Sequence, residues 1–230
     1  MTGEVVTVMI VDDHPMVRQG LAAFLGLAED LRLVGEAGDL AGAAEAVRRL
    51  EPDIVLLDLV LPGARGADAV AAIRAASARA RILVLTSFAE PERVMAALSA
   101  GADGYLSKTV APEDLLTAVR QVARGRSVLD EGALLAASRR SAARLPTGER
   151  LTGREMEVLG LMSEGLANRE IALQLGIAEK TVKVHAGRIY AKLGAQSRAQ
   201  ALVLAARLGL VSLAPQETGW PGLGDGGQPT

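Results

Sequence analysis

The stretch "VVTVMIVDD", residues 5–13, is an apolar run that ends in two acidic residues. Four similar apolar runs follow at residues 31–37, 53–57, 81–86 and 104–107, separated by Ala-rich segments with helical periodicity. Apolar strands that alternate with helices are typical of a parallel sheet whose two faces are covered by helices. The sequence therefore predicts an α/β fold with a doubly wound, five-stranded parallel sheet. The accompanying helices are expected over residues 15–27, 40–50, 66–77, 91–100 and 112–125.

The rest of the chain follows a different pattern. Residues 127–149 are rich in Ser, Arg and Ala without a clear core face, which is typical of a linker. Beyond residue 151 the periodicity is purely helical, with helices expected over residues 152–164, 168–175, 179–193 and 197–208. We therefore expect a domain at residues 1–126, a linker at 127–149, a smaller all-α domain at 150–213 and a disordered tail at 214–230.

Three of the helix starts carry capping signals. Asp39 is expected to cap the second helix of the first domain. Thr152 and Glu155 have the spacing of a capping box at the start of the helical domain, and Asn168 is expected to cap the next helix.

The composition and charge of the chain exclude several classes of protein. The 230 residues contain no Cys, which excludes a disulfide framework and a Cys-based zinc site. No apolar run approaches the ~20 residues of a membrane span, and no signal peptide precedes the first strand, so we expect a cytoplasmic protein. The net charge of −2 conceals an asymmetry. Residues 1–130 hold 13 basic and 18 acidic residues, whereas residues 151–210 hold 8 and 5. The basic segment suggests a nucleic-acid partner.

Polar residues follow the expected strands at one edge of the sheet. Asp12 and Asp13 end the first strand and Asp58 ends the third, while Thr86 and Lys108 end the fourth and fifth. Carboxyl ends of parallel strands meet at the edge where such sheets bind ligands. Three neighbouring carboxylates require a cation, and oxygen ligands suit Mg²⁺. A carboxylate nucleophile, a metal, a hydroxyl and an ammonium group together suit phosphoryl transfer to an aspartate.

This arrangement resembles the CheY-like receiver domain of bacterial two-component response regulators over residues 5–125. The resemblance rests on "VDDHPMVRQGL" (11–21), "DIVLLDLVLPGARG" (53–66), "ILVLTS" (82–87) and "GADGYLSK" (101–108). It implies that Asp58 accepts a phosphoryl group from a sensor histidine kinase. Lys108 would neutralise the phosphoryl oxygens, Thr86 would hydrogen-bond one of them, and Tyr105 would be the switch residue. The implied Mg²⁺ ligands are Asp12, Asp13, Asp58 and the backbone carbonyl of Val60.

Three positions bear on two departures from the common receiver pattern. Thr109 follows Lys108 where many receivers carry Pro, and a cis bond before Thr would cost about 2.5–4 kcal/mol. Val60 and Phe88 stand two residues after Asp58 and Thr86, where receivers tend to control attack by water. Neither side chain can orient a water, so we hypothesise slow loss of the phosphoryl group.

The helical segment, residues 151–210, resembles the LuxR-type helix-turn-helix, and the whole chain therefore resembles the NarL/FixJ family. Its third helix has a basic face opposite an apolar seam, which suits a helix lying in the major groove. The resemblance implies that Lys183 and Val184 face base edges, and that Lys180, Thr181 and Arg188 lie near phosphates. Gly187 stands where the family frequently carries a long polar side chain, and Ala178 replaces the usual capping residue.

The last helix has apolar residues at helical spacing, which suit either a dimer interface or core packing. The dimer interpretation assigns to this face Leu202, Val203, Ala206 and Leu210.

We expect a phosphorylation-switched transcription regulator rather than an enzyme, one that dimerises and binds double-stranded promoter DNA. One alternative is a metal-dependent phosphohydrolase, disfavoured because Val60 stands where that chemistry usually places a second acid. Another is a regulator that binds DNA constitutively, which the complete acidic set disfavours.

Overall fold

The computed structural model describes residues 5–87, 90–130 and 149–213. Phe88, most of the expected linker and the expected tail lie outside these residues. The first domain is built on a parallel sheet with the strand order β2-β1-β3-β6-β7-β8. Its strands are β1 (Val6–Val11), β2 (Leu31–Ala37), β3 (Ile54–Leu57), β6 (Arg81–Thr86), β7 (Gly104–Ser107) and β8 (Val128–Leu129).

The sixth strand is a difference from the five-stranded prediction. β8 pairs Val128 with Gly104 and Leu129 with Tyr105, and the amide of Asp130 donates to the carbonyl of Tyr105 at 3.1 Å. A two-residue strand shows no periodicity that a sequence pattern could reveal. A separate hairpin, β4 (Val60–Leu61) and β5 (Ala64–Arg65), follows β3.

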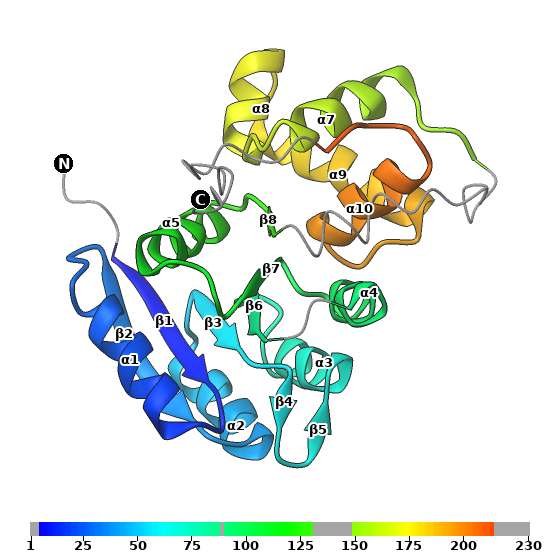
Figure 1. Ribbon diagram of the computed structural model, residues 1–230. Helices are drawn as coiled ribbons and strands as arrows, with labels where there is room; N and C mark the ends of the chain where they lie inside the picture. Colours follow the sequence, from blue (N-terminus) through cyan, green and yellow to red (C-terminus); the bar gives the residue numbers. More distant parts are fainter. Residues whose placement is uncertain (1–4, 88–89, 131–148, 214–230) are drawn as a thin grey trace, which may run out of the picture.

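Helices cover both faces of the sheet (Figure 1). They are α1 (Pro15–Leu25), α2 (Leu40–Leu50), α3 (Ala67–Ala76), α4 (Pro91–Ser99) and α5 (Pro112–Ala123). Successive strand residues point to opposite faces. Met9 and Val11 pack with α2, α3 and α4, whereas Val8 and Ile10 pack with α1 and α5. The doubly wound parallel architecture is confirmed.

The second domain consists of helices packed around their own apolar core (Figure 1). They are α7 (Gly153–Ser163), α8 (Asn168–Leu175), α9 (Glu179–Leu193) and α10 (Arg198–Arg207). The all-α prediction is therefore confirmed. Among the described residues, none of the helices combines the length and the apolar character that crossing a membrane requires.

Two of the three predicted helix caps are confirmed. The Asp39 carboxylate accepts from the amide of Gly42 at 2.9 Å, and Thr152 and Glu155 form the predicted reciprocal capping box. The prediction for Asn168 is wrong, because Asn168 is the first residue of α8 and the cap position is Ala167. The carboxylate of Glu170 accepts from the Ala167 amide at 2.6 Å and so satisfies this helix end.

The two domains contact each other through α10 and α4. The Ser197 hydroxyl lies 3.4 Å from the Leu98 carbonyl, and the Gln200 side-chain amide donates to the Ser99 hydroxyl at 2.9 Å. An ion pair of 2.5 Å joins Arg126, just after α5, to Glu170 of α8. The helical domain is thus packed against the α4, β7 and β8 side of the first domain.

Candidate phosphoacceptor site and nucleic-acid interface

The structure brings the predicted acidic residues together at the carboxyl edge of the sheet. The amide of Asp58 donates to the carbonyl of Val11 at 2.9 Å, which places the ends of β1 and β3 side by side. Asp12 and Asp58 are almost completely buried. One potential ligand atom from each of Asp12, Asp13, His14 and Asp58 lies within 4.8 Å of the others. These carboxylates can hold a hard divalent cation such as Mg²⁺.

Lys108 joins this cluster from the end of β7. Its ammonium nitrogen lies 2.6 Å from Asp12 Oδ2 and 2.6 Å from Asp58 Oδ2. Burial alone would lower the pKa of Lys108, but the hydrogen bonds to the two carboxylates outweigh burial and raise it. Lys108 is therefore a fixed positive charge beside the Asp58 carboxylate. The peptide bond to Thr109 is trans, as are all peptide bonds of the described residues.

The other predicted receiver residues lie around the same edge. Thr86 is fully buried at the end of β6, and its carbonyl accepts from the Lys108 amide at 2.8 Å. Tyr105 is fully buried on β7, and burial raises the pKa of its phenol. The Val60 amide lies 3.2 Å from Asp58 Oδ1 and its side chain is exposed, so the backbone of Val60 adjoins the Asp58 carboxylate.

His14 is a neighbour of this site that sequence reasoning missed. Its Nδ1 atom lies 2.6 Å from Asp13 Oδ1 and 3.3 Å from Asp12 Oδ1. Its position directly after two acidic residues was the signal that could have indicated it.

The predicted DNA-binding residues lie on the outer face of α9. The side chains of Lys180, Thr181, Lys183, Val184 and Arg188 are all exposed. The opposite face of α9 is buried in the helical core through Val182, Ala186, Ile189 and Leu193. Lys183 forms an exposed ion pair with Glu179 at 2.7 Å. The receiver leaves this basic face of α9 exposed to solvent.

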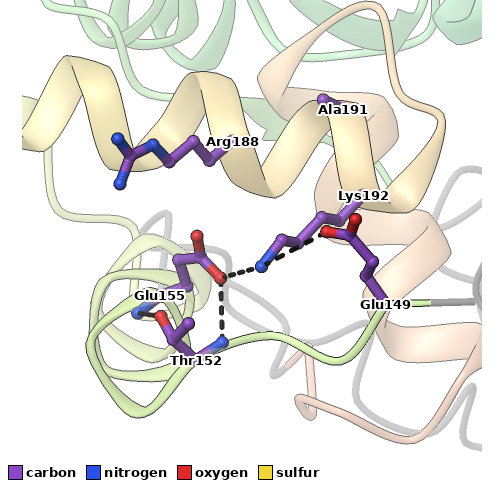
Figure 2. Close-up of a pocket in the computed structure, with 6 residues that line it drawn as sticks. All are labelled: Glu149, Thr152, Glu155, Arg188, Ala191 and Lys192. Carbon is purple, nitrogen blue, oxygen red and sulfur yellow. Dashed lines mark hydrogen bonds and ion pairs between the residues drawn. The ribbon is translucent and has the colours of Figure 1, made fainter. Parts of the chain in front are cut away.

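A groove lined by several charged residues lies between the start of α7 and the last turns of α9 (Figure 2). Glu155, which is 2% exposed, accepts from the Lys192 ammonium at 2.9 Å and from the Thr152 amide at 2.8 Å. Burial alone would raise the pKa of Glu155, but these hydrogen bonds outweigh burial, so the pKa is lowered from its ordinary value. Arg188 lines the same groove one turn before Lys192. Arg188 thus belongs both to this groove and to the exposed basic face of α9.

The predicted dimer face has two different environments. Val203 and Ala206 pack against the receiver core, in a buried cluster that includes Leu98 and Tyr105. Leu202 is buried in the core of the helical domain, and Leu210 packs against that core. Part of the predicted dimer face is therefore covered by the first domain.

Comparisons with known proteins agree with this arrangement. Residues 8–120 match the family of response regulator receiver domains, and residues 149–205 match the bacterial regulatory proteins of the luxR family. The nitrate/nitrite response regulator protein NarL of Escherichia coli (strain K12) is 42% identical over 206 residues, which cover 87% of this chain and 94% of NarL. The chain is a response regulator of the NarL/FixJ family.

Further relatives of this response regulator support the assignment. Response regulator protein VraR of Staphylococcus aureus is 38% identical over 90% of this chain and 99% of VraR. RcsB from Salmonella typhimurium, a response regulator of known structure, has 28% sequence identity to this chain. Its TM-score is 0.55, and the match covers 86% of this chain and 97% of the RcsB chain. An RcsB–DNA complex is 27% identical, with a TM-score of 0.54 over 88% of this chain and 98% of that chain. The response regulator is thus a DNA-binding protein of a two-component system.

Proposed function

We propose that a sensor histidine kinase phosphorylates Asp58 and that this controls dimerisation and promoter binding. The observation that carries the proposal is the placement of the Lys108 ammonium between the carboxylates of Asp12 and Asp58. An Asp58 oxygen attacks phosphorus as the bond from phosphorus to the kinase histidine breaks. Lys108 then pairs with the new phosphoryl oxygens.

Asp12, Asp13, Asp58 and the Val60 carbonyl would hold Mg²⁺ beside this carboxylate. When bound, the cation would neutralise negative charge on the phosphoryl group during its transfer. The protein acts in the cytoplasm, as a regulator rather than as a metabolic enzyme. We propose that the receiver domain ends at residue 126 and that the DNA-binding domain begins at residue 150. The strand β8 lies in the segment between them and extends the receiver sheet.

The contact between the domains suggests which step phosphorylation controls. The basic face of α9 is exposed, whereas Val203 and Ala206 of α10 are packed against the receiver. Tyr105 belongs to the same buried cluster as Val203. A shift of Thr86 and Tyr105 on phosphorylation would therefore disturb the surface that covers α10. Release of this surface would permit dimerisation on adjacent DNA half-sites.

Genome-wide mapping of bound DNA by the full chain, with and without a phosphodonor, tests the proposed function. Acetyl phosphate is expected to raise occupancy at a defined set of paired half-sites. Equal occupancy of the same sites without phosphorylation would instead establish the constitutive regulator, and steady hydrolysis of a phosphoester would establish the phosphohydrolase.

Reversing the charge of Arg126 is expected to loosen the contact between the domains. Arg126→Glu places a carboxylate beside Glu170, and because both side chains are about one-third or more exposed, the effect is up to about 1 kcal/mol. Hydrogen exchange of α10 amides should accelerate by up to about fivefold. Arg32→Glu, at an exposed position of β2 at the far edge of the sheet, is the control. Equal exchange rates of the α10 amides in the two variants would show that this ion pair does not stabilise the contact between the domains.

The phosphorylated protein is expected to lose its phosphoryl group slowly. Val60 adjoins Asp58 and offers no polar side-chain atom that could orient an attacking water. A phosphate-release assay on the purified phosphoprotein measures the lifetime, and a half-life of seconds would refute this expectation.

A further inference from the structure

We infer that Gly187 determines which base pairs the outer face of α9 accepts, by leaving the centre of that face without a side chain. The inference rests on the proposed DNA-binding role of α9. Residues three and four apart share one face of a helix. Val184, Gly187 and Ala191 therefore form an apolar strip, and all three are exposed. We call these residues the α9 strip.

The fold itself does not require glycine at this position. Gly187 lies inside the 15-residue helix α9 and is not among the residues with positive φ. A Cβ atom added to Gly187 would meet nothing within 4 Å. By contrast, a Cβ on Gly104 would lie 2.8 Å from the Leu83 side chain, so the sheet does require that glycine. Glycine also weakens a helix relative to alanine, and at position 187 no packing contact offsets this.

The chemistry of the α9 strip points to the base pairs that it would face. Lys183 and Arg188 flank the strip, and both are exposed. Long basic side chains suit guanine, whereas apolar surface suits the thymine methyl group in the major groove. A bare helix backbone at Gly187 also permits close approach to the floor of the groove. The strip should therefore favour A·T base pairs at the centre of each half-site, beside the position read by Lys183, while Arg188 pairs with the phosphates.

Selection from a random duplex library with the phosphodonor-treated full chain tests this inference. The wild-type protein should enrich A·T at the central positions of each half-site. Gly187→Arg should shift the preference at one of these positions to G·C by about tenfold and leave the flanking positions unchanged. Gln196→Arg adds the same charge at an exposed position outside α9 and should leave the selected sequence unchanged.

A second pair of variants separates recognition from helix stability. Gly160 lies inside α7, and a Cβ there would also meet nothing within 4 Å. Gly160→Ala and Gly187→Ala should both raise the melting temperature, but only Gly187→Ala should change the selected sequence. Identical selected sequences for wild type, Gly187→Ala and Gly187→Arg would overturn the inference while leaving DNA binding intact. A protein that selects no sequence would overturn the proposed function, and this inference with it.

Discussion

Asp58→Asn is expected to abolish phosphoryl incorporation from acetyl phosphate. The amide nitrogen and oxygen of Asn keep the shape of the side chain but provide no carboxylate nucleophile. Asp58 is 4% exposed, and its Oδ2 atom lies 2.6 Å from the Lys108 ammonium, which would pair with the new phosphoryl group. Incorporation of labelled phosphate, measured on the intact protein by mass, should fall below detection.

An exposed aspartate of the same domain provides the control. Asp68 lies in the first turn of α3 on the surface, and Asp68→Asn should incorporate phosphate at the wild-type level. Phosphodonor-dependent DNA binding should be lost in Asp58→Asn alone. Full phosphorylation of Asp58→Asn would show that another residue is the acceptor.

Lys192→Met is expected to destabilise the helical domain by about 3 kcal/mol. The substitution keeps an apolar stem but leaves the buried Glu155 carboxylate without its ammonium partner. The estimate lies at the low end for a broken buried pair because the Thr152 amide still donates to Glu155. The melting temperature of the helical domain should fall by more than about 10 °C. Lys180→Met, at an exposed position of the same helix, should leave the melting temperature nearly unchanged.

Acid should reduce the difference between Lys192→Met and wild type. Because the pKa of Glu155 is lowered from its ordinary value of 4.5 in the folded protein, its stabilising effect is present above pH 4.5. That effect is lost as the pH falls through the lower pKa of the folded state. The free energy of unfolding, measured against denaturant from pH 7 to pH 3, should converge for the two proteins. A constant difference across this range would contradict the role assigned to the ion pair.

The sequence was sufficient to predict the receiver sheet and the position of its acidic residues. Apolar runs that alternate with helical segments determine a parallel sheet, and residues at the ends of its strands must meet at one edge. The sequence alone therefore predicts that Asp12, Asp58 and Lys108 lie close together. His14 was missed because a residue at a helix start shows no periodicity that separates it from an ordinary loop residue.

The contact between the domains could not be predicted in the same way. Val203 and Ala206 were recognised as an apolar face, but periodicity shows only that a face is covered and does not show what covers it. Here the receiver covers it, through α4. The ion pair between Arg126 and Glu170 joins residues 44 positions apart, and no local pattern relates them.

The short strand β8 gives the receiver a second connection to the helical domain, through the covalent chain itself. Leu129 pairs with Tyr105, and the Asp130 amide donates to the Tyr105 carbonyl. Rotation of the Tyr105 ring alone would leave these backbone bonds in place. A displacement of the β7 backbone, however, would also displace Asp130, the last described residue before the helical domain. Backbone hydrogen bonds therefore join β7 to the point at which the chain leaves the receiver for the helical domain.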